Sequence, residues 1–157
     1  MIIDGRSGSG KSTLALQLAE QNPGAQLVRL DDVYPGWDGL AAASRHVVEA
    51  VLHPVRPRWQ RWDWVRDEPA EWHELDPARP IIVEGAGALT RASASLATIT
   101  VWVELDEPTR KRRALERDGD TYAPHWDRWA AQEDAHIAAD NPRALADLVI
   151  EGSEELP

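Results

Sequence analysis

The stretch IIDGRSGSGKS, residues 2–12, decides the fold of this chain. Residues 5–12 of it fit the pattern G-x-x-x-x-G-K-[ST]. The two isoleucines before them are typical of the end of a buried strand, and residues 13–19 (TLALQLA) are typical of the start of a helix. Strand, glycine-rich loop and helix therefore follow one another in the order that a phosphate-binding loop requires.

Each residue type in this loop has a chemical purpose. The glycines let backbone N–H groups turn inward around a β-phosphate, Lys11 reaches the β- and γ-phosphates, and the Ser12 hydroxyl binds Mg²⁺. The helix N-terminus adds partial positive charge. We therefore expect a nucleoside triphosphate to bind with Mg²⁺, and no guanine-reading Asn-Lys-x-Asp segment is present, which favours ATP. The predicted nucleotide contacts in the loop are Gly5, Ser7, Gly8, Ser9, Gly10, Lys11, Ser12 and Thr13.

Length and charge limit the class of protein. A chain of 157 residues, 43% hydrophobic, suits one domain over residues 1–157. Its net charge of -10 argues against electrostatic binding of nucleic acid. There is no cysteine, and no apolar run approaches the roughly 20 residues of a membrane span, so we expect no membrane partner and a cytoplasmic location. Only four residues precede Gly5, so the first strand is short unless the natural start lies upstream.

Apolar strands alternate with helical segments along the chain. This alternation predicts a three-layer α/β/α fold around a parallel sheet of about five strands. The expected strands end near residues 3, 30, 83, 105 and 150, and the expected helices cover about 11–21, 40–52, 90–96, 108–117 and 125–140. Ligands of such sheets bind beyond the carboxyl ends of the strands, so Gly5, Asp31, Glu84 and Asp106 should converge there.

Acidic residues follow two of these strands. Asp31 and Asp32 come directly after the second strand; one could accept the proton of an acceptor hydroxyl, the other could hold a metal-bound water, and we prefer Asp31 as the base. Turn capping is the alternative. Glu84 stands where an acidic Mg²⁺ ligand acts through water, unless it is a solvent-facing strand end. The predicted metal ligands are Ser12, Asp31 and Glu84.

A row of arginines follows the fourth strand. Arg110, Arg113 and Arg117 are three and four residues apart, hence on one face of a helix. They could form a lid over about residues 110–125 that contacts ATP phosphates, or they could pair with the acidic residues nearby. The acidic residues at 118 and 120 flank a glycine that should break this helix and supply a mobile loop.

Residues 54–80 are irregular and punctuated by five prolines, and we expect a substrate-side insertion with a short strand or hairpin. Four of the eight tryptophans lie here, and they form either an aromatic pocket or core packing. Asp63, flanked by Trp62 and Trp64, could contact a substrate. Tyr34, Trp37 and the helix at 40–52 could line a pocket or the surface of a homodimer. The histidines at 53, 73, 125 and 136 lack metal-ligand spacing and are expected to be structural or exposed.

Several segments together resemble the uridine kinase-like branch of the P-loop kinases. The loop at residues 5–12 resembles that family's phosphate loop, Asp31-Asp32-Val33-Tyr34 its Asp-x-Phe-Tyr segment, and Trp62-Asp63-Trp64 its Tyr-Asp-Phe segment. Ile82-Val83-Glu84-Gly85 resembles its metal-associated Glu-Gly strand end, and residues 106–118 resemble its lid helix, D-x-x-T-R-x-x-R-x-x-x-R-D. The matches occur in order and span most of the chain.

This resemblance implies a role for each matched residue. It makes Asp31 the base, gives Asp63 a contact to the sugar of a nucleoside, and gives the three lid arginines contacts to phosphate. The predicted catalytic residues are then Lys11, Asp31 and Arg113, and the predicted substrate residues are Asp32, Tyr34, Trp62, Asp63 and Glu84. The chain departs from the family in being shorter, in its Trp- and Pro-rich 54–80 stretch, and in lacking a basic lid tip beyond residue 118.

Three functions remain open on this basis. The first is a kinase that transfers the γ-phosphate of Mg-ATP to a nucleoside, and the second is the same chemistry on a nucleotide, a sugar acid, a shikimate-like alcohol or an antibiotic hydroxyl. The third is a slow ATPase that works as a switch, for which the sequence offers little. Arginines that face the acceptor would indicate a phosphorylated acceptor, and the 54–80 stretch contains four candidates, Arg56, Arg58, Arg61 and Arg66.

Overall fold

The computed structural model describes residues 1–152. Its strands are β1 (Ile2–Gly5), β2 (Gln26–Arg29), β3 (Arg58–Asp63), β4 (Glu68–Glu74), β5 (Ile81–Glu84), β6 (Thr100–Glu104) and β7 (Leu148–Glu151). Its α-helices are α1 (Lys11–Gln21), α2 (Leu40–His46), α3 (Arg91–Ala94), α4 (Glu107–Tyr122), α5 (Trp126–Asp140) and α6 (Pro142–Leu145). Short 3₁₀ turns form η1 (Leu30–Asp32) and η3 (Ala123–His125), and a π-turn, η2 (Val47–Val51), extends α2.

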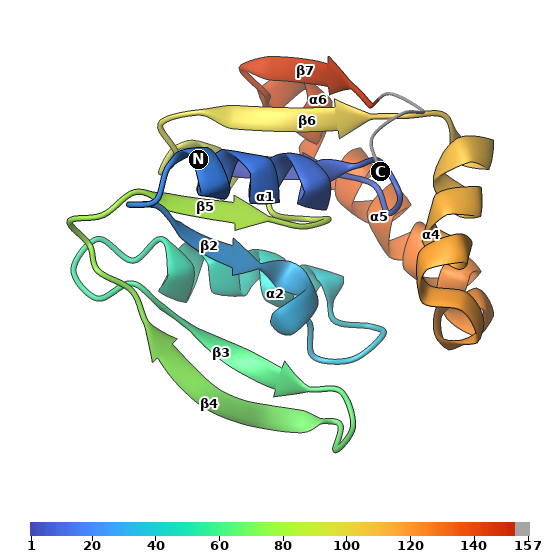
Figure 1. Ribbon diagram of the computed structural model, residues 1–157, viewed down its shortest axis with the longest axis horizontal. Helices are drawn as coiled ribbons and strands as arrows, with labels where there is room; N and C mark the ends of the chain where they lie inside the picture. Colours follow the sequence, from blue (N-terminus) through green and yellow to red (C-terminus); the bar gives the residue numbers. More distant parts are fainter. Residues whose placement is uncertain (153–157) are drawn as a thin grey trace.

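Five strands form one parallel sheet in the order β2-β5-β1-β6-β7. The central strand β1 pairs with β5 and β6, with Ile2 opposite Val83 on one side and Thr100 on the other. Every carboxyl end therefore lies at the same edge, where the chain leaves β1 for the glycine-rich loop (Figure 1). The predicted α/β fold with a five-stranded parallel sheet is confirmed.

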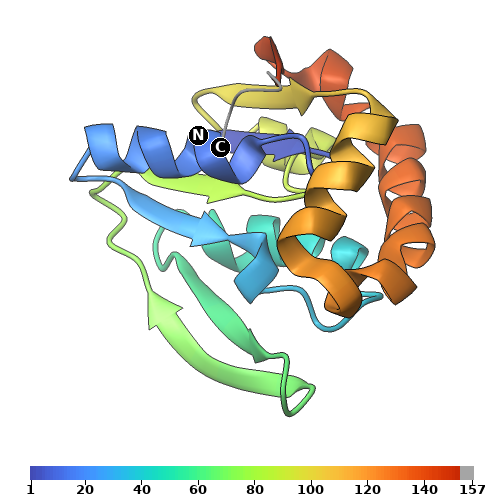
Figure 2. The ribbon, with the colours of Figure 1, turned by 45° about the vertical axis from the view of Figure 1, so that its right-hand side comes forward.

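Helices cover the sheet on both faces (Figures 1 and 2). Neighbouring residues of a strand point to opposite faces, so Ile2 joins one core cluster and Ile3 the other. The Ile3 cluster includes Ala15 and Leu18 of α1, and the Ile2 cluster includes residues of α2, η2, α4 and α5. Because both faces of the central strands β1, β5 and β6 are covered, these strands contain runs of apolar residues, which is the pattern that predicted them.

The stretch 54–80 forms an antiparallel hairpin of β3 and β4 that projects from the body of the molecule (Figures 1 and 2). Arg58 pairs with Glu74, and Asp63 pairs with Glu68 at the turn. The sequence predicted either a short strand or a hairpin in this stretch, and the structure has the hairpin. Trp59 stacks on His73, with 4.2 Å between ring centroids, so this part of the tryptophan cluster stabilises the hairpin.

Helix α4 contains the break that the sequence predicts. Gly119 has φ 53° and ψ -133°, which is not helical. The chain beyond it does not form the expected open loop: it makes one more turn to Tyr122, which is buried in the main core. Within residues 1–152, no helix is both long enough and apolar enough to cross a membrane.

Candidate active site

The loop between β1 and α1 is tightly packed against the start of α4. Gly8 has φ 80°, and a Cβ at this position would collide with the backbone carbonyl of Arg110. Gly10 is also left-handed, with φ 97°, and precedes the first residue of α1. Both positions therefore require glycine. Lys11 follows with only 8% of its surface exposed, so its charge is held inside the loop.

A buried carboxylate lies beside the start of α1. Glu84, at the end of β5, is 1% exposed. Its Oε2 accepts a hydrogen bond from the Ser12 hydroxyl at 3.2 Å, and its Oε1 faces Arg29 Nε at 3.4 Å. Burial raises the pKa of Glu84, and Asp31 adds to this rise, whereas the charges of Lys11 and Arg29 oppose it.

These oxygens suit Mg²⁺. Hydroxyl and carboxylate oxygens are the ligands that this ion prefers, and it is usually held by one or two side chains together with phosphate oxygens and water. Within the described residues, no group of three or more His, Asp or Glu side chains could hold a metal by itself. Ser12 and Glu84 therefore fit a metal that arrives with a nucleotide.

The two adjacent aspartates have different surroundings. Asp31, in η1, lines a cleft that also includes Lys11. Its Oδ2 lies 3.8 Å from Nη2 of Arg29. Its side chain is half exposed, at 50%. Asp32 is not among the residues that line the cleft; its charge acts on Arg61 of the hairpin. Of the two, only Asp31 lines the cleft.

Lys11, Arg29 and Asp31 lie on one cleft of about 630 Å³, whose lining does not include Ser12 or Glu84. It is lined by Ser7, Lys11, Arg29, Asp31, Tyr34, Trp37, Trp64, Ala86, Arg117, Asp118, Thr121, Tyr122 and Trp129. The phosphate loop and the charged residues thus share one cavity with five aromatic side chains. A substrate with both an anionic and a planar part matches this lining.

The aromatic side chains come from separate segments and pack against one another. The Trp37 ring stacks with Tyr122, with centroids 5.5 Å apart, and tilts toward Trp64 at 5.2 Å. Trp129 meets the buried Tyr34 edge to face at 4.7 Å. Trp64 also donates from Nε1 to the backbone carbonyl of Asp31 at 2.8 Å, which ties the hairpin to the cleft. We refer to Tyr34, Trp37, Trp64, Tyr122 and Trp129 as the aromatic wall.

The predicted lid arginines are not equivalent. Arg110 is buried and donates to the carbonyls of Leu105 at 3.0 Å and Ser7 at 3.2 Å, so it supports the phosphate loop from outside. Arg117 lines the cleft and is held in a two-point ion pair with Asp118. Arg113 is partly exposed and is not among the residues that line the cleft. Of these three arginines, only Arg117 therefore faces the cleft.

The structure places two other predicted residues away from the cleft. The Asp63 carboxylate accepts the N–H groups of Val65 and Arg66, both at 3.0 Å, and so closes the hairpin turn. Those bonds lower the pKa of Asp63. Trp62 lines a smaller cavity beside α2. Conversely, the sequence analysis gave no site role to Arg29, Tyr122 or Trp129; only the position of Arg29 two residues before Asp31 could have indicated one.

Comparisons with known proteins bear on the fold. Neither a protein-family model nor a curated protein sequence matches the chain. Among solved structures, a "possible uridine kinase" from Bacillus stearothermophilus aligns over 95% of this chain and 86% of its own, with a TM-score of 0.63 and 17% identity. The chain has the same fold as this structure. A "putative fructose transport system kinase" from Silicibacter sp. TM1040 aligns over 94% of this chain and 87% of its own, with a TM-score of 0.56 and 21% identity.

This fold agrees with the resemblance seen in the motifs. The similarity extends beyond the short segments and covers nearly the whole chain in each case. In this fold, the glycine-rich loop, the buried Glu84 and the cleft beyond β1 lie at the strand ends where ligands of parallel sheets bind.

Proposed function

We propose that this protein is an ATP-dependent kinase that phosphorylates a hydroxyl of a small molecule with an uncharged planar ring, most simply a nucleoside. The observation that carries the proposal is the shared cleft: Lys11, Asp31 and the aromatic wall line one cavity. The two solved structures with this fold, described as a possible uridine kinase and a putative fructose transport system kinase, support phosphoryl transfer as the class of reaction. Because ATP is the donor, we also propose a cytoplasmic site of action.

Positioning and charge stabilisation account for the chemistry. The acceptor oxygen forms a bond to the γ-phosphorus as the bond to the β,γ-bridging oxygen breaks, and ADP leaves. Asp31 takes the proton from the acceptor hydroxyl. Lys11 stabilises the charge that develops on the transferred phosphoryl group. Mg²⁺, when bound through Ser12 and Glu84, neutralises phosphate charge.

The arginines of the hairpin argue against a phosphorylated acceptor. Arg61 forms a two-point ion pair with Glu71, with Nε–Oε1 and Nη2–Oε2 distances of 2.7 and 3.0 Å. Arg56 pairs with Glu74 at 3.1 Å, and Arg58 lies over the Trp72 ring at 4.3 Å. None of the four hairpin arginines is among the residues that line the cleft. The hairpin therefore contributes only the aromatic Trp64 to the lining of the cleft, which favours an acceptor with an uncharged ring.

The direct test is ADP production with Mg-ATP across a panel of nucleosides, nucleoside monophosphates, sugars and hydroxylated acids. We expect strong stimulation by nucleosides and little by their monophosphates. Stimulation by sugars alone would support the kinase activity but assign it a sugar as the acceptor. Slow hydrolysis that no compound stimulates would contradict the proposal and favour the ATPase switch.

Glu84→Gln should raise the Mg²⁺ concentration needed for half-maximal activity by about 10- to 100-fold, the usual range for losing a partner of a metal site. The carboxylate is the active form, and burial raises its pKa, so wild-type activity should fall as the pH drops through this raised value. The variant should lose this acidic limb. Titrations with Mg²⁺ at several pH values check both effects, with the exposed Glu20→Gln as control. An unchanged Mg²⁺ requirement would remove Glu84 from the metal site.

Trp37→Ala should raise the KM for the acceptor about tenfold, the size expected for one lost ring-stacking contact. The KM for ATP should change less than about twofold, because Trp37 belongs to the aromatic wall and not to the phosphate loop. Trp72→Ala, which removes a hairpin tryptophan packed on Arg58, is the matched control and should leave both constants near wild type. Equal changes in the two KM values would contradict the assignment of the aromatic wall to the acceptor.

A further inference from the structure

Helix α5 carries two buried ionisable residues on one face. Glu133 and His136 are one turn apart, and each is less than 10% exposed. Neither lines the ATP and acceptor cleft. Both instead reach the junction between β1 and the phosphate loop, from the opposite side to α1.

Glu133 contacts the loop itself. Its Oε1 accepts the backbone N–H of Ser7 at 2.7 Å, and its Oε2 accepts from Arg6 Nε at 2.9 Å. Arg6 also pairs with the exposed Asp134 at 2.8 Å. Burying a carboxylate that is only 3% exposed costs free energy of folding unless a positive charge pairs with it. Arg6 is that partner here.

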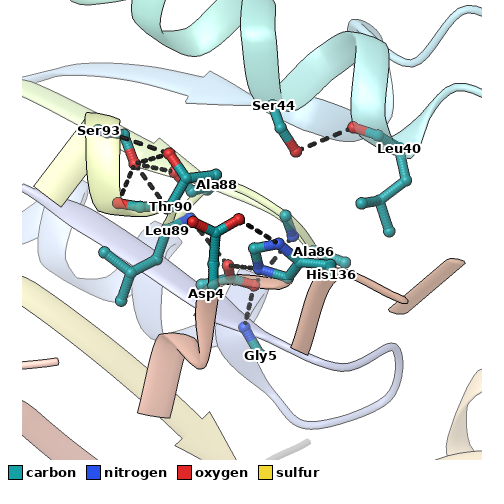
Figure 3. Close-up of polar contacts among 12 residues, drawn as sticks. Asp4, Gly5, Leu40, Ser44, Ala86, Ala88, Leu89, Thr90, Ser93 and His136 are labelled. Atoms are coloured by element: carbon teal, nitrogen blue, oxygen red, sulfur yellow. Dashed lines mark hydrogen bonds and ion pairs between the residues drawn. The ribbon is translucent and has the colours of Figure 1, made fainter. Parts of the chain in front are cut away.

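His136 fixes the residue just before the loop (Figure 3). Its Nε2 lies 3.1 Å from Oδ2 of the fully buried Asp4. Asp4 also accepts the backbone N–H groups of Gly5 at 2.6 Å, Gly87 at 3.1 Å and Leu89 at 2.8 Å. The start of the loop is therefore anchored to α5 and to the segment after β5.

The contacts of Ser7 determine how the next peptides point. Its N–H is held by Glu133, and its carbonyl accepts from Arg110 at 3.2 Å. Fixing both peptide groups leaves little freedom for the left-handed Gly8 that follows. The Ser9 N–H is also held, by the Arg6 carbonyl at 3.1 Å. The loop is thus ordered before a ligand binds, so a phosphate need not supply the free energy of ordering it.

We propose that Glu133 is a positioning residue that holds the phosphate loop in its triphosphate-binding conformation, with Arg6 cancelling its charge. This inference rests on the proposed function, because it presumes that the loop binds Mg-ATP. It predicts two separable effects: loss of the Ser7 contact loosens the loop, and loss of Arg6 alone leaves a carboxylate close to the phosphates.

Calorimetry with Mg-ATP tests the first effect. Glu133→Ala should raise the Kd by about 10- to 100-fold, the range for a lost hydrogen bond to a charged group. Glu133→Gln should lose much less, because its amide oxygen can still accept the Ser7 N–H. Asp134→Asn removes the other partner of Arg6 without touching Ser7, and it should stay within about twofold of wild type. In turnover, the KM for ATP should rise in Glu133→Ala while the KM for the acceptor stays constant.

A double mutant tests the second effect and covers the case in which Glu133→Ala fails to fold. Arg6→Ala should weaken Mg-ATP binding, because it leaves the Glu133 carboxylate without its cation. Adding Glu133→Gln should restore part of the affinity, because it removes that negative charge. Additive losses in the pair, or wild-type affinity in Glu133→Ala, would overturn the inference while wild type still binds Mg-ATP. A wild-type protein that does not bind Mg-ATP would overturn the proposed function, and this inference with it.

Discussion

Lys11→Ala should lower the rate of phosphoryl transfer by at least about a thousandfold, the upper range for removing one preorganised charge that stabilises a transition state. Lys11 is almost fully buried within the loop, so water cannot replace its charge there. Steady-state ADP production with the best acceptor measures the effect.

Lys111, the only other lysine, provides the matched control. It is exposed on α4, with its ammonium 5.6 Å from the centre of the Trp126 ring. Lys111→Ala should retain nearly full activity, because surface cation–ring contacts contribute little. Comparable losses in the two variants would mean that the assay reports overall stability, and residual turnover above about a tenth in Lys11→Ala would contradict a role in transfer.

Asp31→Asn should lower turnover by about 10²- to 10⁴-fold, the range for losing a general base. Binding of Mg-ATP should stay close to wild type, because asparagine keeps the shape of the side chain and the aspartate lies outside the phosphate loop. Turnover and calorimetry on the same variant separate the two effects.

The adjacent Asp32→Asn distinguishes a base from a local charge. Asp32 belongs to the same turn, yet it does not line the cleft. We expect it to stay within a few-fold of wild type. If Asp32→Asn lost more activity than Asp31→Asn, the assignment of the base would have to be reversed.

Local sequence patterns predicted the parts of the site that are formed by consecutive residues. The loop at residues 5–12 sets its own conformation, because Gly8 and Gly10 adopt left-handed backbone angles that few other residues tolerate. Glu84 was predicted because an apolar strand ends at it. The central strands of the sheet were predicted in the same way, because strands buried on both faces appear in the sequence as apolar runs.

The aromatic wall could not be predicted in this way. Trp37, Tyr122 and Trp129 belong to three separate segments, and nothing in the local pattern around any of them indicates the other two. Asp63 shows the opposite problem. Its flanking tryptophans suggested binding, but a short carboxylate two residues before a turn can take the nearest backbone N–H groups, and here it does.

The lid arginines show a limit of helical periodicity. Spacings of three and four placed Arg110, Arg113 and Arg117 on one face, yet the helix rises about 10 Å between the first and the last. Arg110 therefore reaches the carbonyl of Ser7, while Arg117 reaches the cleft. Helical periodicity predicts that side chains lie on the same face of a helix. It does not predict which group each of them contacts at its own height along the helix axis.

The hairpin is structurally separate from the five-stranded sheet that holds the phosphate loop. Within the described residues, β3 and β4 pair only with each other, and Trp64 connects them to the turn that carries Asp31. The glycine-rich loop, by contrast, leaves the central strand β1. Under the proposed function, substitutions in the hairpin can therefore alter the acceptor site without changing the strands that hold the phosphate loop.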